Sequence, residues 1–98
     1  MQYNFEWEPA KAQTNARKHG VTFEEATKVF KDPMALTVFD EDHSSEEDRW
    51  ITLGNVSGQC YVVVAHTYRD KVENMVTIRM ISARFATKHE IKQYEGWA

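Results

Sequence analysis

The sequence predicts an α+β fold in which a single antiparallel sheet packs against helices. Residues 60–69 form a nearly continuous β-branched and aromatic run, as expected of a central strand that is buried on both faces. A second such run, residues 75–83, follows a short polar turn at residues 69–74, so the two runs should form an antiparallel hairpin. Two capping-box patterns, Thr22–Glu25 and Thr87–Glu90, mark the starts of helices outside this hairpin.

The N-terminal part of the chain predicts one strand and two helices. Residues 2–7 alternate between aromatic and polar side chains, which indicates a half-buried strand. Pro9 suits the first turn of a helix and Gly20 its end, so a short surface helix should lie between them. The second helix begins after Thr22 and ends at Asp32, because the residue before a proline disfavours the helical conformation.

Two further strands are predicted at residues 34–39 and 49–53, and an acidic segment separates them. Residues 40–48 contain six acidic side chains and no basic one. This composition favours an exposed loop. The segment begins like a calcium-binding loop, but Ser45 and Ile51 stand where an EF-hand requires Gly and Glu. We therefore predict no metal site there.

The rest of the chain completes the predicted topology. Residues 54–58 begin and end with glycine and should form the turn into the central hairpin. A last helix should cover residues 88–95. The element order is therefore β-α-α-β-β-β-β-α, which is typical of an α+β fold. At 98 residues the chain has the size of one domain, residues 1–98, with a single modest core.

Charge is distributed unevenly along the chain. Residues 1–48 carry 11 acidic and 5 basic side chains, whereas residues 49–98 carry 4 acidic and 7 basic ones. The net charge of −3 argues weakly against a nucleic-acid partner, but the asymmetry permits a basic face. Neither a membrane-span pattern nor a signal-peptide pattern is present, so we expect a cytoplasmic protein without a membrane partner. The single Cys60 should be a core residue.

The residues that could take part in catalysis or binding are mostly lysines, arginines and histidines. Phosphate loops, dinucleotide fingerprints and paired metal-binding motifs are absent from the sequence. A set of basic and aromatic side chains suits RNA cleavage without a metal ion, which needs a base, an acid and fixed positive charge at the phosphate. We predict catalytic roles for Lys18, His19, His66, Arg69 and Arg79, and RNA or phosphate binding by Arg49, Tyr68 and Arg84.

Each of these residues also has a structural explanation. Arg79 lies within a strand and could pair with Glu25 or Asp40. Arg84 could be tied to the acidic segment, and His66 could be a satisfied core histidine. If the arginines form only structural ion pairs, the chain would be a protein-interaction module that binds a partner at its sheet edge. Both interpretations remain open at the level of residue patterns.

An ordered set of short segments resembles the BrnT-type toxins, the ribonuclease half of bacterial type II toxin–antitoxin pairs. The resemblance covers nearly the whole chain, and its most specific parts are Lys-His-Gly-Val at residues 18–21 and Ile-Ser-Ala-Arg at residues 81–84. The segments are FEW at residues 5–7, NARKHGV at 15–21, VFKDP at 29–33, DHS at 42–44, EDRW at 47–50, VVV at 62–64, Thr67-Tyr68-Arg69, and IRMISAR at 78–84. Met80 replaces the usual aliphatic residue, a volume-conserving change.

This resemblance implies a RelE-like fold and a metal-independent endoribonuclease that inhibits translation, with no cofactor. It implies RNA as substrate, products with 2′,3′-cyclic phosphate ends, and a cognate antitoxin that neutralises the toxin and binds DNA as a complex. Homo-oligomers are expected only through the antitoxin. The polar positions of the family fall on Lys18, His19, Arg49, Arg69, Arg79 and Arg84. The alternative is a degenerate toxin that only binds an antitoxin-like partner.

Overall fold

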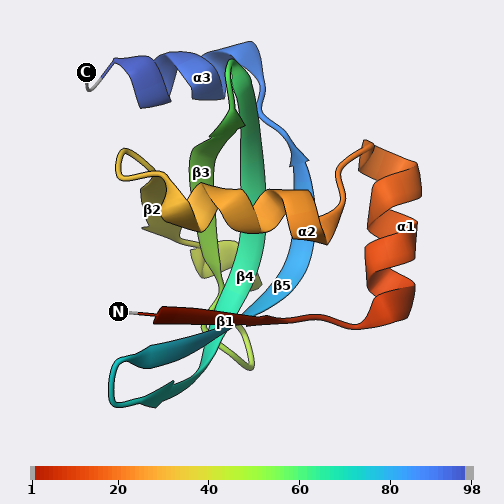
Figure 1. Cartoon of the computed structure of the whole chain (residues 1–98), viewed down its shortest axis with the longest axis vertical. Helices are drawn as coiled ribbons and strands as arrows, with labels where there is room; N and C mark the ends of the chain where they lie inside the picture. Colours follow the sequence, from red (N-terminus) through yellow and green to blue (C-terminus); the bar gives the residue numbers. More distant parts are fainter. Residues whose placement is uncertain (1, 97–98) are drawn as a thin grey trace.

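The computed structural model describes residues 2–96, apart from the side chains of residues 70 and 71. The elements follow the predicted order, and the α+β class is confirmed (Figure 1). They are β1 (Gln2–Glu6), α1 (Pro9–His19), α2 (Phe23–Ala26) with its 3-10 continuation η1 (Thr27–Lys31), β2 (Leu36–Phe39), the 3-10 turn η2 (Glu41–His43), β3 (Trp50–Ser57), β4 (Cys60–Val72), β5 (Met75–Phe85) and α3 (Lys88–Glu95).

The five strands form one sheet in the order β1-β5-β4-β3-β2. Neighbouring strands are antiparallel except β1, which runs parallel to β5 from the pair Gln2–Met75 to the pair Glu6–Arg79. The sheet is therefore mixed, whereas a wholly antiparallel sheet was predicted. The alternation of aromatic and polar residues in β1 indicates that one face of the strand is buried. It does not indicate whether the strand runs parallel or antiparallel to its neighbour. α1 and α2 carry the chain from the β1 edge to the β2 edge (Figure 1).

The hydrophobic core lies between the sheet and the α2–η1 segment, which crosses one sheet face (Figure 1). Phe23 and Val29 are fully buried against Val64 and Ile78 of the central strands. Full burial of such a side chain contributes about 1.5–3 kcal/mol. Gly54 lets η1 approach β3 closely, because a Cβ at this position would lie 3.0 Å from the Val29 Cβ.

Two bulges interrupt the pairing of β4 with β5. One leaves Arg69 as an extra residue on β4, between Tyr68 and Asp70, and the other is on β5. Met80 lies opposite His66, but Ser82 lies opposite Ala65, so Ile81 is an extra residue on β5. A bulge of this kind shifts the alternation of side chains between the two faces. This shift decides which polar side chains of β5 lie together.

Before the bulge on β5, the even-numbered residues of the strand are buried. After this bulge, the buried residue is the odd-numbered Ala83. Arg79, Ser82 and Arg84 therefore share the sheet face opposite α2. Without the extra residue, alternation would place Arg79 on the other face from Ser82 and Arg84. The bulge thus gathers polar side chains of the resembling IRMISAR segment on one face.

Several element boundaries differ from the prediction. β4 continues to Val72, so the turn predicted at residues 69–74 is limited to residues 73 and 74. β3 continues to Ser57, so the turn into β4 is shorter than predicted and has Gly58 in a left-handed conformation (φ 54°). The second helix is α-helical for only four residues and then 3-10. By contrast, α3 has its predicted bounds, and both hydrogen bonds of the Thr87–Glu90 capping box are present. Within residues 2–96, no helix is long and apolar enough to cross a membrane.

Candidate functional site

Asn15 fastens α1 to the free edge of β5. β1 pairs only with Met75–Arg79, so the later part of β5 has no neighbouring strand on that side. The Asn15 side chain takes this place: its Nδ2 donates to the backbone oxygen of Ala83 (2.8 Å), and the backbone N–H of Ala83 donates to its Oδ1 (3.0 Å). Nδ2 also donates to the Val21 carbonyl at 3.0 Å. Sequence reasoning missed Asn15, although it lies in the resembling NARKHGV segment.

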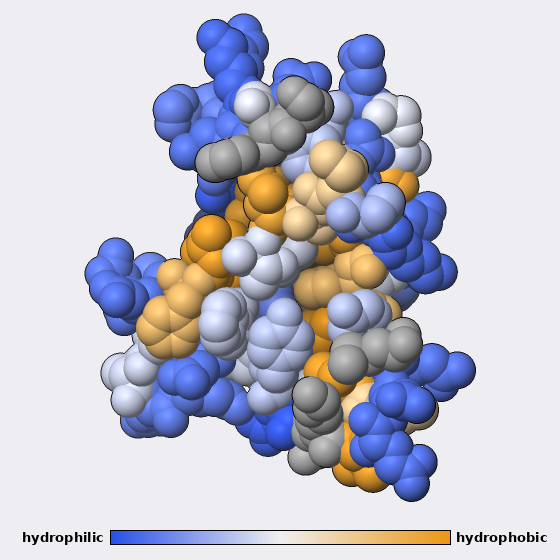
Figure 2. Space-filling view, turned by 90° about the vertical axis from the view of Figure 1, so that its left-hand side faces the viewer, coloured by the Kyte–Doolittle hydropathy of each residue, from blue (hydrophilic) through white to orange (hydrophobic). Residues whose placement is uncertain are grey.

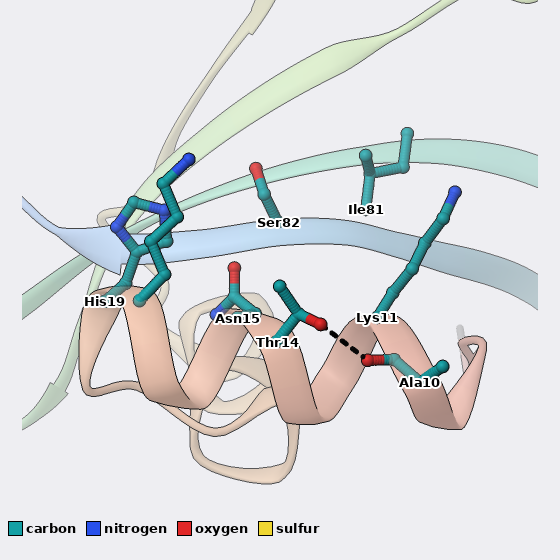
Figure 3. A pocket seen from close by; sticks show the side chains of 8 residues that line it. Ala10, Lys11, Thr14, Asn15, His19, Ile81 and Ser82 are labelled. Carbon is teal, nitrogen blue, oxygen red and sulfur yellow. Dashed lines mark hydrogen bonds between the residues drawn. The ribbon is translucent and has the colours of Figure 1, made fainter.

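Between α1 and β5 lies an open groove of about 300 Å³ (Figure 3). Lys11, Lys18 and His19 line it from α1, and Ser82 lines it from β5. In the described part of the chain, none of these three basic side chains has a carboxylate within ion-pair distance. The basic residues of the last turn of α1 also complement the helix dipole. An anion in the groove would therefore meet positive charge that no carboxylate neutralises.

Arg69 and Arg79 meet at Glu6. Arg79 Nη1 lies 3.8 Å from Glu6 Oε1, and Arg69 Nε lies 3.6 Å from the same oxygen. Arg69 Nη1 also donates to Glu47 Oε2, in the acidic segment, at 3.0 Å. We call Arg69, Arg79, Glu6 and Glu47 the arginine cluster. Its members bring together the end of β4, the middle of β5, β1 and the acidic segment.

The ion pairs of the arginine cluster are exposed and therefore weak. The side chains of its four members are 34–46% exposed. Ion pairs with such exposure contribute only about 0–1 kcal/mol. Glu6 was not among the predicted partners of Arg79, which were Glu25 and Asp40. A phosphate can replace these carboxylates at small cost, because Arg binds both groups with the same geometry.

Arg84 is held by a structural ion pair. Arg84 Nη1 and Nη2 donate to the two carboxylate oxygens of Glu90 at 2.8 and 2.9 Å. These hydrogen bonds lower the pKa of Glu90 to about 2. Since Glu90 also accepts from the Thr87 N–H, the pair fixes the first turn of α3 to β5. The partner of Arg84 is thus Glu90 rather than the acidic segment.

His66 lies inside the core. Its side chain is fully buried, its Nε2 forms a 2.7 Å hydrogen bond with Thr52 Oγ1, and its ring packs edge-on against Phe30 and Tyr68. Burial lowers the pKa of His66 to about 4. The imidazole lies on the core side of the sheet, opposite Met80 and between the rings of Phe30 and Tyr68, away from the arginine cluster. The geometry favours the structural explanation for His66 over the predicted catalytic one.

Comparison with known proteins identifies the family. The profile of the family described as "Ribonuclease toxin, BrnT, of type II toxin-antitoxin system" matches residues 7–90. The chain belongs to the BrnT toxin family. The crystal structure of the Brucella abortus ribonuclease toxin BrnT is similar in fold, with a TM-score of 0.61 and 22% sequence identity over 90% of this chain and 100% of that one. No curated protein sequence matches the chain.

In this BrnT-family chain, aromatic side chains form a row across the sheet. Neighbouring ring centroids lie 4.9–6.0 Å apart along the whole row. The row consists of Tyr3, Phe30, His66, Tyr68, Trp50 and Phe39. Tyr3, Tyr68 and Phe39 are each more than 40% exposed. On the side of the molecule where β2 and the N-terminus lie, hydrophobic and weakly polar side chains gather between hydrophilic margins (Figure 2).

The structure divides the predicted site residues into groups. Lys18 and His19 lie together in the α1–β5 groove, and Arg69 and Arg79 lie together in the arginine cluster. Arg79 of the arginine cluster and Ser82 of the groove are three residues apart on β5, about 10 Å along the strand, so the cluster and the groove are neighbouring surfaces. The remaining predicted residues lie elsewhere: Tyr68 and His66 in the aromatic row, Arg84 at α3, and Arg49 at the end of the acidic segment, where its N–H donates to Ser44 Oγ.

Proposed function

We propose that this chain is an endoribonuclease toxin that cleaves RNA without a metal ion, inhibits translation in the cytoplasm, and is neutralised by a cognate antitoxin. The observation that carries the proposal is the match of residues 7–90 to the ribonuclease toxin family. The uncompensated basic side chains of the α1–β5 groove and the neighbouring arginine cluster support it. Together they offer the positive charge that an RNA backbone requires.

The chemistry we propose is transfer of the phosphate to the neighbouring 2′-hydroxyl. A base removes the 2′-hydroxyl proton, the oxygen attacks phosphorus, and the 5′-oxygen leaves with a proton from an acid. The products are a 2′,3′-cyclic phosphate and a free 5′-hydroxyl. His19 and Lys18 are the candidates for the two proton transfers, because both line the groove and neither has a carboxylate partner among the described residues.

Arg69 and Arg79 would bind the phosphate and stabilise the charge that develops on it. Planar guanidinium groups bind phosphate oxygens in pairs, and fixed charge at the phosphate is usually the largest catalytic contribution. The carboxylates of Glu6 and Glu47 now lie where phosphate oxygens would bind. Because these pairs are exposed, RNA can displace them.

The decisive experiment is RNA cleavage in EDTA by the purified, antitoxin-free protein. We expect cyclic phosphate ends, and a loss of at least about 100-fold in rate when Arg69→Ala and Arg79→Ala are combined. Arg17→Ala is the matched control, since Arg17 is an exposed basic residue of α1 outside the groove lining. Cleavage that requires an added divalent metal, or that survives the double substitution, contradicts the proposal. If free RNA is not cut, the same comparison is made with translating ribosomes.

A second candidate function is a non-catalytic toxin relative that only binds an antitoxin-like partner. The observation that favours it is that Arg69, Arg79 and Arg84 all have carboxylate partners. Expression of the chain alone separates the two functions. Growth arrest that depends on Lys18, Arg69 and Arg79 supports the ribonuclease, whereas harmless expression of a folded protein supports the binding module.

We further propose that the antitoxin docks on the aromatic row and that the toxin–antitoxin complex binds DNA. The row ends at the Phe39–Trp50 strand pair, where the acidic segment leaves β2 and enters β3. This arrangement places apolar rings beside six acidic side chains. Such a surface repels RNA but suits a basic polypeptide with apolar anchors. Tyr68 is therefore proposed to contact the antitoxin rather than an RNA base.

A further inference from the structure

Thr67 of β4 has a buried hydroxyl that lacks a hydrogen-bond partner. The residue is 1% exposed, and its Oγ1 bonds to no atom of the described residues. By contrast, the equally buried Thr52 bonds to both Thr37 and His66. An unsatisfied buried polar group costs about 1–3 kcal/mol. A group with this cost requires an explanation, and a missing ligand is one.

The position of Thr67 indicates what this ligand is. Thr67 lies directly opposite Arg79 in the β4–β5 pairing. Side chains of directly opposed residues have their Cβ atoms about 4.5–5.5 Å apart and share one sheet face. Arg69 follows two residues later on β4, and Glu6 lies opposite Arg79 on β1. The unpartnered hydroxyl therefore lies at the base of the arginine cluster.

We propose that the Thr67 hydroxyl donates a hydrogen bond to a phosphate oxygen of RNA held by Arg69 and Arg79. This inference rests on the proposed function and adds a binding residue to the same site. Threonine hydroxyls and arginine side chains are both common phosphate ligands in protein–nucleic acid complexes. When RNA enters, Glu6 and Glu47 leave the arginines, and the phosphate satisfies the hydroxyl that the free protein leaves unpaired. The cost in the free protein is thus recovered in the complex.

Thr67→Val tests the inference through two measurements. The stability of the free protein should stay the same or rise, whereas its affinity for RNA should fall. The substitution removes the hydroxyl and keeps a β-branched side chain, so the free protein should unfold at the same or a higher urea concentration. Its affinity for an RNA oligonucleotide with non-cleavable 2′-O-methyl groups should fall about 10-fold, the loss of one hydrogen bond to a charged group. Thr67→Ser should keep most of the affinity.

Thr77→Val is the matched control. Thr77 is a partly buried threonine on β5 that lies opposite Asp70 rather than in the Thr67–Arg79 pair, so its hydroxyl should not affect RNA binding. In an Arg79→Ala background, Thr67→Val should change affinity less than twofold, because the phosphate is no longer held beside it.

Each outcome is decisive. If Thr67→Val destabilises the free protein and leaves RNA affinity unchanged, the hydroxyl is structural and the inference is wrong. If the parent protein binds RNA and Thr67→Val binds it equally well, the inference fails while the proposed function stands. If the folded parent protein binds neither free RNA nor translating ribosomes, both are overturned.

Discussion

At the scale of single residues, His66 shows how a buried polar group is accommodated in an apolar strand. The ring lies between Phe30 and Tyr68, and Thr52 supplies one hydrogen bond. Nδ1 has no partner within the described residues. The histidine is therefore held neutral at ordinary pH. Its charged form would lose hydration without gaining an acidic partner.

We expect His66 to make stability depend on pH between about 4 and 6.5. The folded-state pKa of His66 is about 4, below the ordinary value of 6.5, so the unfolded chain binds more protons across this interval. Stability is complete above pH 6.5 and decreases as the pH falls toward 4, by on the order of 3 kcal/mol. Urea unfolding at a series of pH values measures this slope.

His66→Gln should flatten the slope, because glutamine keeps an N–H donor but does not titrate. His43→Gln is the control, since His43 is exposed and its Nδ1 already bonds to Asp40 at 2.9 Å. An equal slope in the His66→Gln protein would show that other groups cause the acid sensitivity. Glu90 does not explain that outcome, because its pKa, lowered from 4.5 to about 2, reduces stability mainly at lower pH than this interval.

At the scale of elements, the sequence predicted those helices and hairpins that interactions between nearby residues determine. The β4–β5 hairpin and the Thr87–Glu90 capping box involve residues close in sequence, and both are confirmed. The parallel pairing of β1 with β5 and the bulge at Ile81 depend on segments far apart or on one extra residue, and no local pattern signals them. Asn15 belongs to the same class, since its partner Ala83 is 68 residues away.

Asn15 takes the role of an additional strand at the edge of β5. Its amide group accepts and donates as a peptide group would, and so satisfies both backbone groups of Ala83. The residue is only 6% exposed. α1 consequently lies beside Ser82, with His19 over the groove (Figure 3). Lys18 lines the same groove.

We expect Asn15→Ala to cost about 2–4 kcal/mol of stability and to reduce RNA cleavage. The substitution leaves two buried backbone groups of Ala83 and the Val21 carbonyl without this partner. Asn15→Asp should also destabilise, because a carboxylate cannot donate to the carbonyls of Val21 and Ala83. Gln13→Ala, at an exposed position of α1, should change stability by less than about 0.5 kcal/mol. Denaturant unfolding and RNA cleavage measure the effects, and an undisturbed Asn15→Ala protein would contradict the edge role.

At the scale of the whole molecule, basic side chains without an acidic partner among the described residues and basic side chains with one lie in different places. The uncompensated basic side chains line the groove beside α1, whereas the acidic segment, which begins after β2, reaches Arg69 of the arginine cluster through Glu47. A net charge of −3 therefore does not exclude a polyanionic substrate. The sequence predicted Lys18, His19, Arg69 and Arg79 as site residues and allowed acidic partners for the arginines, but it did not identify the partner residues. Those partners, Glu6 and Glu47, come from distant segments.

The acidic segment beside the aromatic row yields a prediction for antitoxin binding. Phe39→Ala should weaken binding of the cognate antitoxin at least about 10-fold, because Phe39 is an exposed ring that packs on Trp50 and directly precedes the acidic segment. RNA cleavage by the same variant should be unchanged. Higher salt should slow association with the antitoxin, since its attraction to the acidic segment is electrostatic.

Phe85→Ala is the matched control, because Phe85 is a similarly exposed phenylalanine, on β5 near Gly20. It should leave antitoxin binding unchanged in a direct titration. If Phe39→Ala instead impairs RNA cleavage and keeps antitoxin affinity, the aromatic row stacks on RNA bases, and the acidic segment does not prevent RNA from reaching it. If neither property changes, the row contributes to the fold alone, and the antitoxin must bind at another surface. Reduced affinity with intact cleavage would establish that the antitoxin is recognised by residues that RNA cleavage does not require.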